Sequence, residues 1–301
     1  ANIRSIVAYN TDSKIIGVIR ENGILLAGVA PQGELIEGQS SVVQLDAWNY
    51  EDAAYKTDMG MHFYMPSLLS RGGGRGFGRG FGGAPAGDPI KEALDKIESV
   101  KAIFREAKAY HQKGADKQIN LKLEATKGLF NRTQKLFVHC NQVKQMIVAI
   151  DFVKEFGFDV VIVGGSESWQ IADLLKQNNI AVILAERHAL PTMTDDDVDL
   201  PYKSATYLQD AGVLYAINDG DGQTRGRNLP FNAGTAAGYG ITKEQALSSI
   251  TLNAAKILGI DNITGSIEVG KDANIVISEG DILDMRSSIV TYAFIQGRQV
   301  S

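Results

Sequence analysis

The stretch KLFVHCN at residues 135–141 decides the fold class, because an apolar strand there ends abruptly in polar residues. Apolar side chains at helical spacing follow it from Val143 until Gly157 stops the pattern. Similar apolar runs recur at 159–163, 180–184 and 213–217. Strands without alternation that are followed by helices predict a parallel sheet buried on both faces. Periodicity leaves a closed barrel and an open doubly wound sheet as alternatives.

Polar or glycine residues follow each of these strands. They are His139, Gly164 and Gly165, Arg187 and His188, and Asp219 with Asp221. Parallel α/β folds place their chemistry at the carboxyl ends of the strands, so we take these residues as the candidate site.

Each candidate also has a structural interpretation. His139 could be held only by loop hydrogen bonds, and Asp219 lies in an Asn-Asp-Gly-Asp-Gly run that favours a turn. Arg187 and His188 could pair with the acidic run at 195–197. The two glycines at 164 and 165 fit an anion site at a helix start, or a close approach of two backbones.

Composition excludes several classes. The 301 residues are 44% hydrophobic, which suffices for one large α/β barrel or two domains. A net charge of −5 gives no general reason to bind nucleic acid. The single cysteine, Cys140, forbids an intrachain disulfide, and no apolar run is long enough to span a membrane.

The first third of the chain is less regular. Residues 23–31 and 41–45 are predicted strands, and 89–112 is a predicted charged helix. A Gly/Arg-rich segment at 71–88 is predicted to be a flexible surface insertion. Arginine and phenylalanine among glycines also occur in single-strand RNA-binding segments, but the acidic chain favours the insertion.

The chain begins at Ala1 and runs at once into a strand-like sequence, without a signal peptide. We expect Ala1 to be an internal point of a longer precursor. A periplasmic or exported location is therefore expected, with the cytoplasm as the alternative.

The C-terminal region carries a family resemblance. TLNAAKILG at 251–259, GSIEVGKDAN at 265–274 and Gly297-Arg298 together resemble the C-terminal signature of amidohydrolases, closest to the imidazolonepropionase-like branch. The resemblance implies an α/β fold, a (β/α)8 TIM-type barrel at 1–262 that is incomplete at its N-terminal end. It implies that 263–301 belong to a small β-sandwich built from both chain ends.

The resemblance also implies a divalent metal, usually zinc, bound at the carboxyl rim of the barrel. His139 matches the strand-five histidine ligand. Asp219 matches the strand-eight aspartate, a metal ligand and catalytic base, with Asp221 as its substitute. The strand-six histidine is absent because Val163 runs into Gly164, and the chain contains no His-x-His pair. We expect that pair, with the first barrel strand, to lie before Ala1.

Two functions follow from this resemblance. The first is a hydrolase that cleaves a non-peptide C–N bond in a small or cyclic amide through metal-activated water. Its substrate would contact His188, Arg187, Gly164, Gly165 and Asp221. The second is a catalytically inactive relative that serves as a binding or assembly subunit. Since an incomplete barrel leaves unpaired edges, we expect a retained upstream segment or a homo- or hetero-oligomer to cover them.

Overall fold

The computed structural model describes residues 2–69, 88–113, 118–185, 188–191, 195–219 and 225–301. Two sheets organise this part of the chain. The larger sheet contains, in spatial order, β1 (Leu26–Val29), β2 (Leu35–Gln44), β3 (Ala54–Tyr64), β4 (Lys135–Cys140), β5 (Val160–Gly164), β6 (Ala181–Leu184) and β7 (Tyr215–Ile217). The smaller sheet contains β10 (Arg298–Gln299), β9 (Ile289–Ile295) and β8 (Ile275–Glu279).

Strands β3 to β7 are parallel, as predicted, whereas β1, β2 and β3 pair in antiparallel fashion. The predicted strands at 135–138, 159–163, 180–184 and 213–217 correspond to β4 to β7. The predicted strands at 23–31 and 41–45 overlap β1 and β2, but β3 was not predicted from the sequence.

Both faces of the parallel strands are covered, which explains their apolar sequences. Leu136 and Val138 of β4 join the main hydrophobic core on the outer face. Phe137, between them, joins a second cluster on the inner face with Val161 of β5 and Ala216 of β7. The side-chain period of two therefore gives each strand two apolar faces.

Helices surround the sheet. They are α1 (Lys14–Glu21), α2 (Tyr50–Ala53), α3 (Pro89–Gln112), α4 (Leu121–Glu124), α5 (Lys127–Phe130), α6 (Val143–Phe156), α7 (Ala172–Gln177), α8 (Leu200–Asp210), α9 (Leu229–Gly238), α10 (Lys243–Ile250) and α11 (Leu252–Leu258), with 3-10 turns η1 (Ser5–Ala8), η3 (Ser168–Ile171) and η4 (Gly226–Asn228). The predicted helix at 89–112 is confirmed as α3, capped by Asp88. The rest of the predicted insertion at 71–88 lies outside the described residues.

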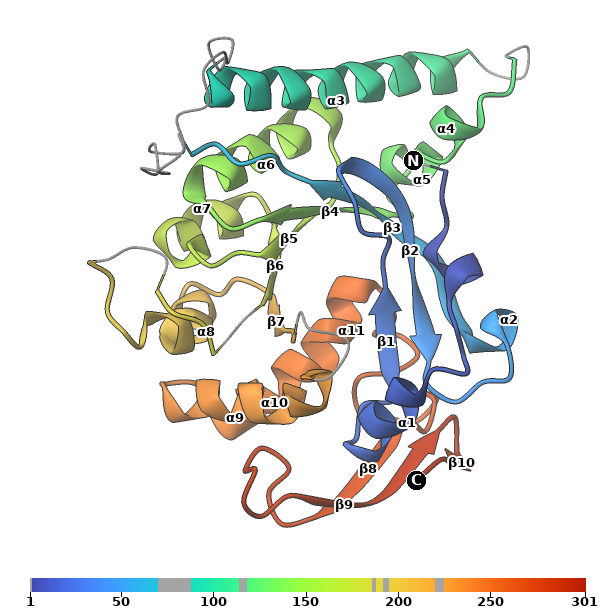
Figure 1. Cartoon of the computed structure of the whole chain (residues 1–301), viewed down its shortest axis with the longest axis vertical. Coiled ribbons are helices and arrows are strands. Elements are labelled where there is room, and N and C mark those ends of the chain that lie inside the picture. Colours follow the sequence, from blue (N-terminus) through green and yellow to red (C-terminus); the bar gives the residue numbers. More distant parts are fainter. Residues whose placement is uncertain (1, 70–87, 114–117, 186–187, 192–194, 220–224) are drawn as a thin grey trace, which may run out of the picture.

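The large sheet is curved, with α3, α6, α7 and α8 along its outer side (Figure 1). Helix α11 lies on the inner side, between β7 and β1 (Figure 1), and its Ala255 and Ile257 join the inner cluster. Lys135 Nζ donates to the carbonyl oxygens of Lys256 at 2.9 Å and Ile257 at 2.6 Å, and Lys56 Nζ donates to that of Gly259 at 2.7 Å. The curved parallel sheet fits a TIM-type barrel.

The C-terminal sheet packs beside the large sheet through Ala293, Ile295 and Leu25. Tyr55 of β3 connects the two, because its hydroxyl donates to Asp272 Oδ2 at 2.6 Å. The predicted β-sandwich is present only as this one three-stranded sheet within the described residues. The division of the chain at residue 262 remains a prediction. None of the described helices is long and apolar enough to cross a membrane.

Candidate active site

A cavity of about 610 Å³ opens on the inner face of the large sheet. Its walls are mostly apolar and include Ile15, Ile16 and Ile19 of α1 and Leu258 of α11. Such a volume lies within the range of small-molecule sites, which combine apolar walls with a few polar groups. Four of its polar lining residues, His62, His139, Asn218 and Asp219, lie at or just before or after the carboxyl ends of β3, β4 and β7.

Two histidines form the polar centre of the cavity. His62 comes from β3 and His139 from β4, and both line the cavity wall. His62 Nδ1 lies 2.8 Å from His139 Nε2, so one ring donates a hydrogen bond to the other. His62 is only 5% exposed. Parallel pairing sets this contact, because β3 and β4 run side by side with Tyr64 opposite His139.

Burial keeps both imidazoles neutral. It lowers the pKa of His62 to about 3, with a further contribution from His139, and lowers the pKa of His139 to about 4. Among the described residues, His62 Nε2 is buried and has no hydrogen-bond partner. A neutral imidazole nitrogen with a lone pair is a good metal donor, so these rings have the protonation state that a ligand requires.

Asp219 lies on the wall of the same cavity, just after β7. Its Oδ2 accepts a hydrogen bond from Asn232 Nδ2 of α9 at 3.1 Å, which orients the carboxylate. The structure therefore brings His139 and Asp219, which the sequence singled out, to one cavity. They come from strands at different positions in the sheet, as expected for a barrel rim.

The other candidate residues that the structure describes are not among those lining this cavity. His188 is exposed, and its Nε2 hydrogen-bonds Thr235 Oγ1 at 2.9 Å outside the cavity wall. At Gly164, with φ +104°, a Cβ atom would lie 2.5 Å from Asn141 Oδ1, and at Gly165 it would lie 2.8 Å from Val182 Cγ1. The backbone of each glycine therefore lies so close to a neighbouring side chain that a Cβ atom would collide with it. Arg187 and Asp221 lie outside the described residues, and substrate contact by any of these residues remains a prediction.

His62 is the site residue that the sequence analysis missed. It lies inside β3 rather than at an obvious strand end, in the run Met61-His62-Phe63-Tyr64. One signal was available, because Met61, Phe63 and Met65 alternate with His62 and Tyr64. That period of two predicts a strand with one apolar face and one face carrying the histidine.

The donor types fit a zinc site, but their number does not. A catalytic zinc generally takes three protein ligands. Among the described residues, no three histidine, cysteine, aspartate or glutamate side chains are close enough to hold one ion. His62 and His139 would supply two donors, so we derive no catalytic step through a metal from these residues.

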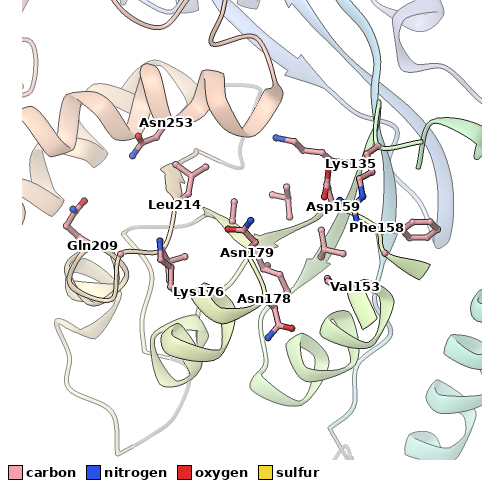
Figure 2. A pocket seen from close by; sticks show the side chains of 18 of the residues that line it. Lys135, Val153, Phe158, Asp159, Lys176, Asn178, Asn179, Gln209, Leu214 and Asn253 are labelled. Carbon is pink, nitrogen blue, oxygen red and sulfur yellow. The ribbon is translucent and has the colours of Figure 1, made fainter. Parts of the chain in front are cut away.

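A second cavity, of about 780 Å³, lies at the opposite ends of the strands. Figure 2 shows Lys135 and Asp159, at the amino-terminal ends of β4 and β5, around it with Lys176, Asn179 and Asn253. None of its described lining residues is a histidine. Since barrel chemistry lies at the carboxyl ends of the strands, we place the candidate active site at the histidine cavity despite its smaller volume.

Comparison with known proteins identifies the class. Residues 142–300, more than half of the chain, match the amidohydrolase family, so the chain belongs to this family and the resemblance seen in its signature is confirmed. The fold agrees with an amidohydrolase from Thermotoga maritima MSB8, with a TM-score of 0.83 over 100% of this chain and 78% of that chain, at 23% identity.

Among individual relatives, the chain is similar to imidazolonepropionases. It is 30% identical over 208 residues to that of Picrophilus torridus, covering 66% of this chain and 48% of the relative. It is 31% identical over 150 residues to that of Thermoplasma volcanium, covering 48% of this chain and 35% of the relative. The chain thus spans about half the length, or less, of these relatives.

Proposed function

We propose that this chain forms the active-site part of a hydrolase that cleaves a non-peptide C–N bond in a small or cyclic amide. One observation carries the proposal: His62, His139 and Asp219 meet at one apolar cavity on the carboxyl side of a parallel sheet. Membership of the amidohydrolase family supports the reaction class. The similarity to imidazolonepropionases makes an imidazolone ring the first substrate to try.

The residues suit distinct tasks. Asp219, oriented by Asn232, would accept a proton from the attacking water. The apolar walls would exclude other water and hold the ring of the substrate. His62 and His139 would supply two ligands of a divalent metal, zinc by family resemblance, whose chemistry would be to lower the pKa of water and polarise a carbonyl; the described residues do not complete its ligand set.

Closure of the barrel is a further part of the proposal. β1 and β7 are the two end strands of the large sheet, so within the described residues each has an unpaired edge. An additional polypeptide segment or a second subunit would pair with these edges, complete the (β/α)8 barrel and bring further donors to the cavity. Sedimentation of the purified protein, which should give a mass above 32.5 kDa if a subunit supplies the pairing, tests this step.

Metal content and hydrolysis test the function together. We expect the purified protein to contain one divalent transition metal per active site and to open an imidazolone ring, followed by ultraviolet absorbance. His62→Ala and His139→Ala should lose the metal, and Asp219→Asn should lower kcat by about 100-fold or more. His111→Ala is the matched control, because His111 hydrogen-bonds Leu123 O and Thr126 Oγ1 away from the cavity.

The alternative function is a binding or assembly subunit without catalysis. The observation that favours it is the lack of a third donor near His62 and His139 among the described residues. A protein that contains no transition metal and hydrolyses none of a panel of cyclic amides, yet binds them, would establish this alternative and refute the hydrolase.

A further inference from the structure

Aromatic rings flank both histidines in a regular pattern. Parallel pairing of β3 and β4 places His62 beside Phe137, and Tyr64 beside His139. The His62 and Phe137 rings stack with centroids 4.9 Å apart and 5° between planes. The Tyr64 and His139 rings stack at 4.0 Å and 11°. Neighbouring strands lie about 4.8 Å apart, so rings at one register position on one face meet face to face.

The Tyr64 ring is fixed at both ends. Its main chain belongs to β3, and the adjacent Met65 N–H donates to the His139 carbonyl at 3.1 Å. At the other end the Tyr64 hydroxyl donates to the Pro31 carbonyl, in the β1–β2 connection, at 3.0 Å. Tyr64 is not among the described residues that line the cavity. It therefore acts on the site only through His139.

His139 needs an external constraint on its ring. The last torsion of a histidine side chain is broad and roughly two-fold, so the ring can turn over unless its surroundings prevent it. Turning the ring over would exchange Nε2 for a carbon and break the 2.8 Å contact with His62 Nδ1. A tethered ring lying flat on one face of His139 restricts this motion.

We propose that Tyr64 is a positioning residue that fixes the ring orientation of His139 and so keeps Nε2 directed at His62. The catalytic consequence rests on the proposed function, but the orientation itself does not. Phe137 has the corresponding position beside His62. Because Phe137 and His62 are buried whereas Tyr64 is half-buried, Tyr64 can be replaced with less damage to the core.

Nuclear magnetic resonance of protein with ¹⁵N-labelled histidine tests the orientation directly. In the natural sequence, with any bound metal removed by a chelator, we expect one tautomer each for His62 and His139, and slow exchange of the shared imidazole proton. Tyr64→Leu, which removes the ring, should give averaged tautomer signals for His139 and raise proton exchange by about 10-fold or more, the scale of losses from such supporting contacts. Tyr64→Phe keeps the ring and should leave the His139 signals near their original positions.

Controls separate positioning from general damage. Tyr292→Leu, at an exposed tyrosine of β9, should leave the His62 and His139 signals unchanged. If Tyr64→Leu does not fold, Tyr64→Met is measured instead. Unchanged His139 signals in a folded Tyr64→Leu or Tyr64→Met protein would overturn the proposal.

Hydrolysis kinetics separate this proposal from the proposed function. Tyr64→Leu should lower kcat by about 10-fold with little change in KM, since substrate does not touch Tyr64. Movement of the His139 signals in a protein that hydrolyses no amide would support the positioning role and refute the hydrolase. Unchanged signals and an unchanged kcat in an active protein would refute the positioning role alone.

Discussion

Replacing Tyr55 with phenylalanine should destabilise the protein at the connection between its two sheets. The Tyr55 hydroxyl donates to Asp272 Oδ2 at 2.6 Å and accepts from Asn274 Nδ2 at 3.1 Å. Phenylalanine removes both hydrogen bonds. Asp272 keeps a bond from Gln296 Nε2 at 3.1 Å, and Asn274 keeps one to Thr264 Oγ1 at 2.9 Å, so neither partner loses every contact.

The magnitude follows from the charged acceptor. A hydrogen bond to an ionised group contributes about 1.5–3 kcal/mol, and the remaining contacts of Asp272 place the expected loss near about 2 kcal/mol. Unfolding entropy is about 2.1 cal/mol/K per residue, so in this chain of 301 residues that loss should lower the melting temperature by roughly 3 °C. Urea unfolding at pH 8, followed by circular dichroism, measures the change in the free energy of unfolding.

The pH dependence gives a second test of the same contact. Burial, followed by the hydrogen bond to Asp272, raises the pKa of Tyr55 to about 12 from its usual value of 10. Since the folded-state pKa is raised, the contribution of the neutral hydroxyl is complete below pH 10 and is lost as the pH rises through about 12. The difference in stability between the natural protein and Tyr55→Phe should therefore shrink over this interval.

Tyr292→Phe is the matched control, because Tyr292 is an exposed tyrosine of the C-terminal sheet. Its free energy of unfolding should change by less than about 0.5 kcal/mol. Equal stability of Tyr55→Phe and the natural protein at pH 8 would refute the reasoning, because Tyr55 would then not hold the sheets together.

The remaining predictions concern single sites. Gly164→Ala should lower the free energy of unfolding by about 1–3 kcal/mol in urea titrations, since φ is +104° and the new Cβ would meet Asn141; an unchanged midpoint would contradict this. Gly17→Ala in α1, where a Cβ meets nothing within 4 Å, should raise the free energy of unfolding by about 0.5–1 kcal/mol. A decrease in this free energy would contradict the helical conformation of residue 17. Burial raises the pKa of Cys140 to about 12, so a thiol reagent at pH 8 should label the folded protein slowly and the urea-unfolded protein fast. Rapid labelling of the folded protein would show that Cys140 is accessible.

The parallel strands could be predicted because the burial of each strand is evident from its own short stretch of sequence. Strands β4 to β7 are covered on both faces, so each reads as a continuous apolar run that ends in a polar or glycine residue. That ending also identified His139 and Asp219, since the carboxyl end of a strand is a local feature of the sequence.

The partner of His139 could not be found in the same way. His62 lies 77 residues earlier in the chain, and only the register between β3 and β4 brings the two rings together. Strand β3 escaped prediction because its apolar residues alternate with polar ones such as Lys56, Asp58 and His62, instead of forming the continuous apolar run that marks β4 to β7. Their places are explained by tertiary contacts, such as the bond from Lys56 to Gly259 O, which no local pattern encodes.

The family signature was recognised as a pattern, and the structure gives it physical content. Asp272 and Asn274, in the GSIEVGKDAN segment, receive and donate the hydrogen bonds that attach the C-terminal sheet to Tyr55. Gly265, with φ +98°, lies where a Cβ would be 2.6 Å from the Ala255 Cβ. These signature residues therefore join α11, the C-terminal sheet and β3, while Ala254, Ile257 and Leu258 of the same signature line the cavity.

The hydrogen bonds from Lys56 and Lys135 to α11 affect which amino acids this helix can carry in its last turn. The ammonium groups of Lys56 and Lys135 donate hydrogen bonds to the peptide oxygens of Lys256, Ile257 and Gly259. These oxygens lie at the C-terminal end of α11, where the helix dipole concentrates negative charge. A peptide oxygen is present whatever amino acid stands at the position. The hydrogen bonds at Lys256 and Ile257 therefore do not depend on the side chain at those positions, whereas at Gly259, with φ +70°, a Cβ would lie 2.9 Å from Lys56 Nζ. Loss of either ammonium group would remove its hydrogen bonds to the last turn of the helix.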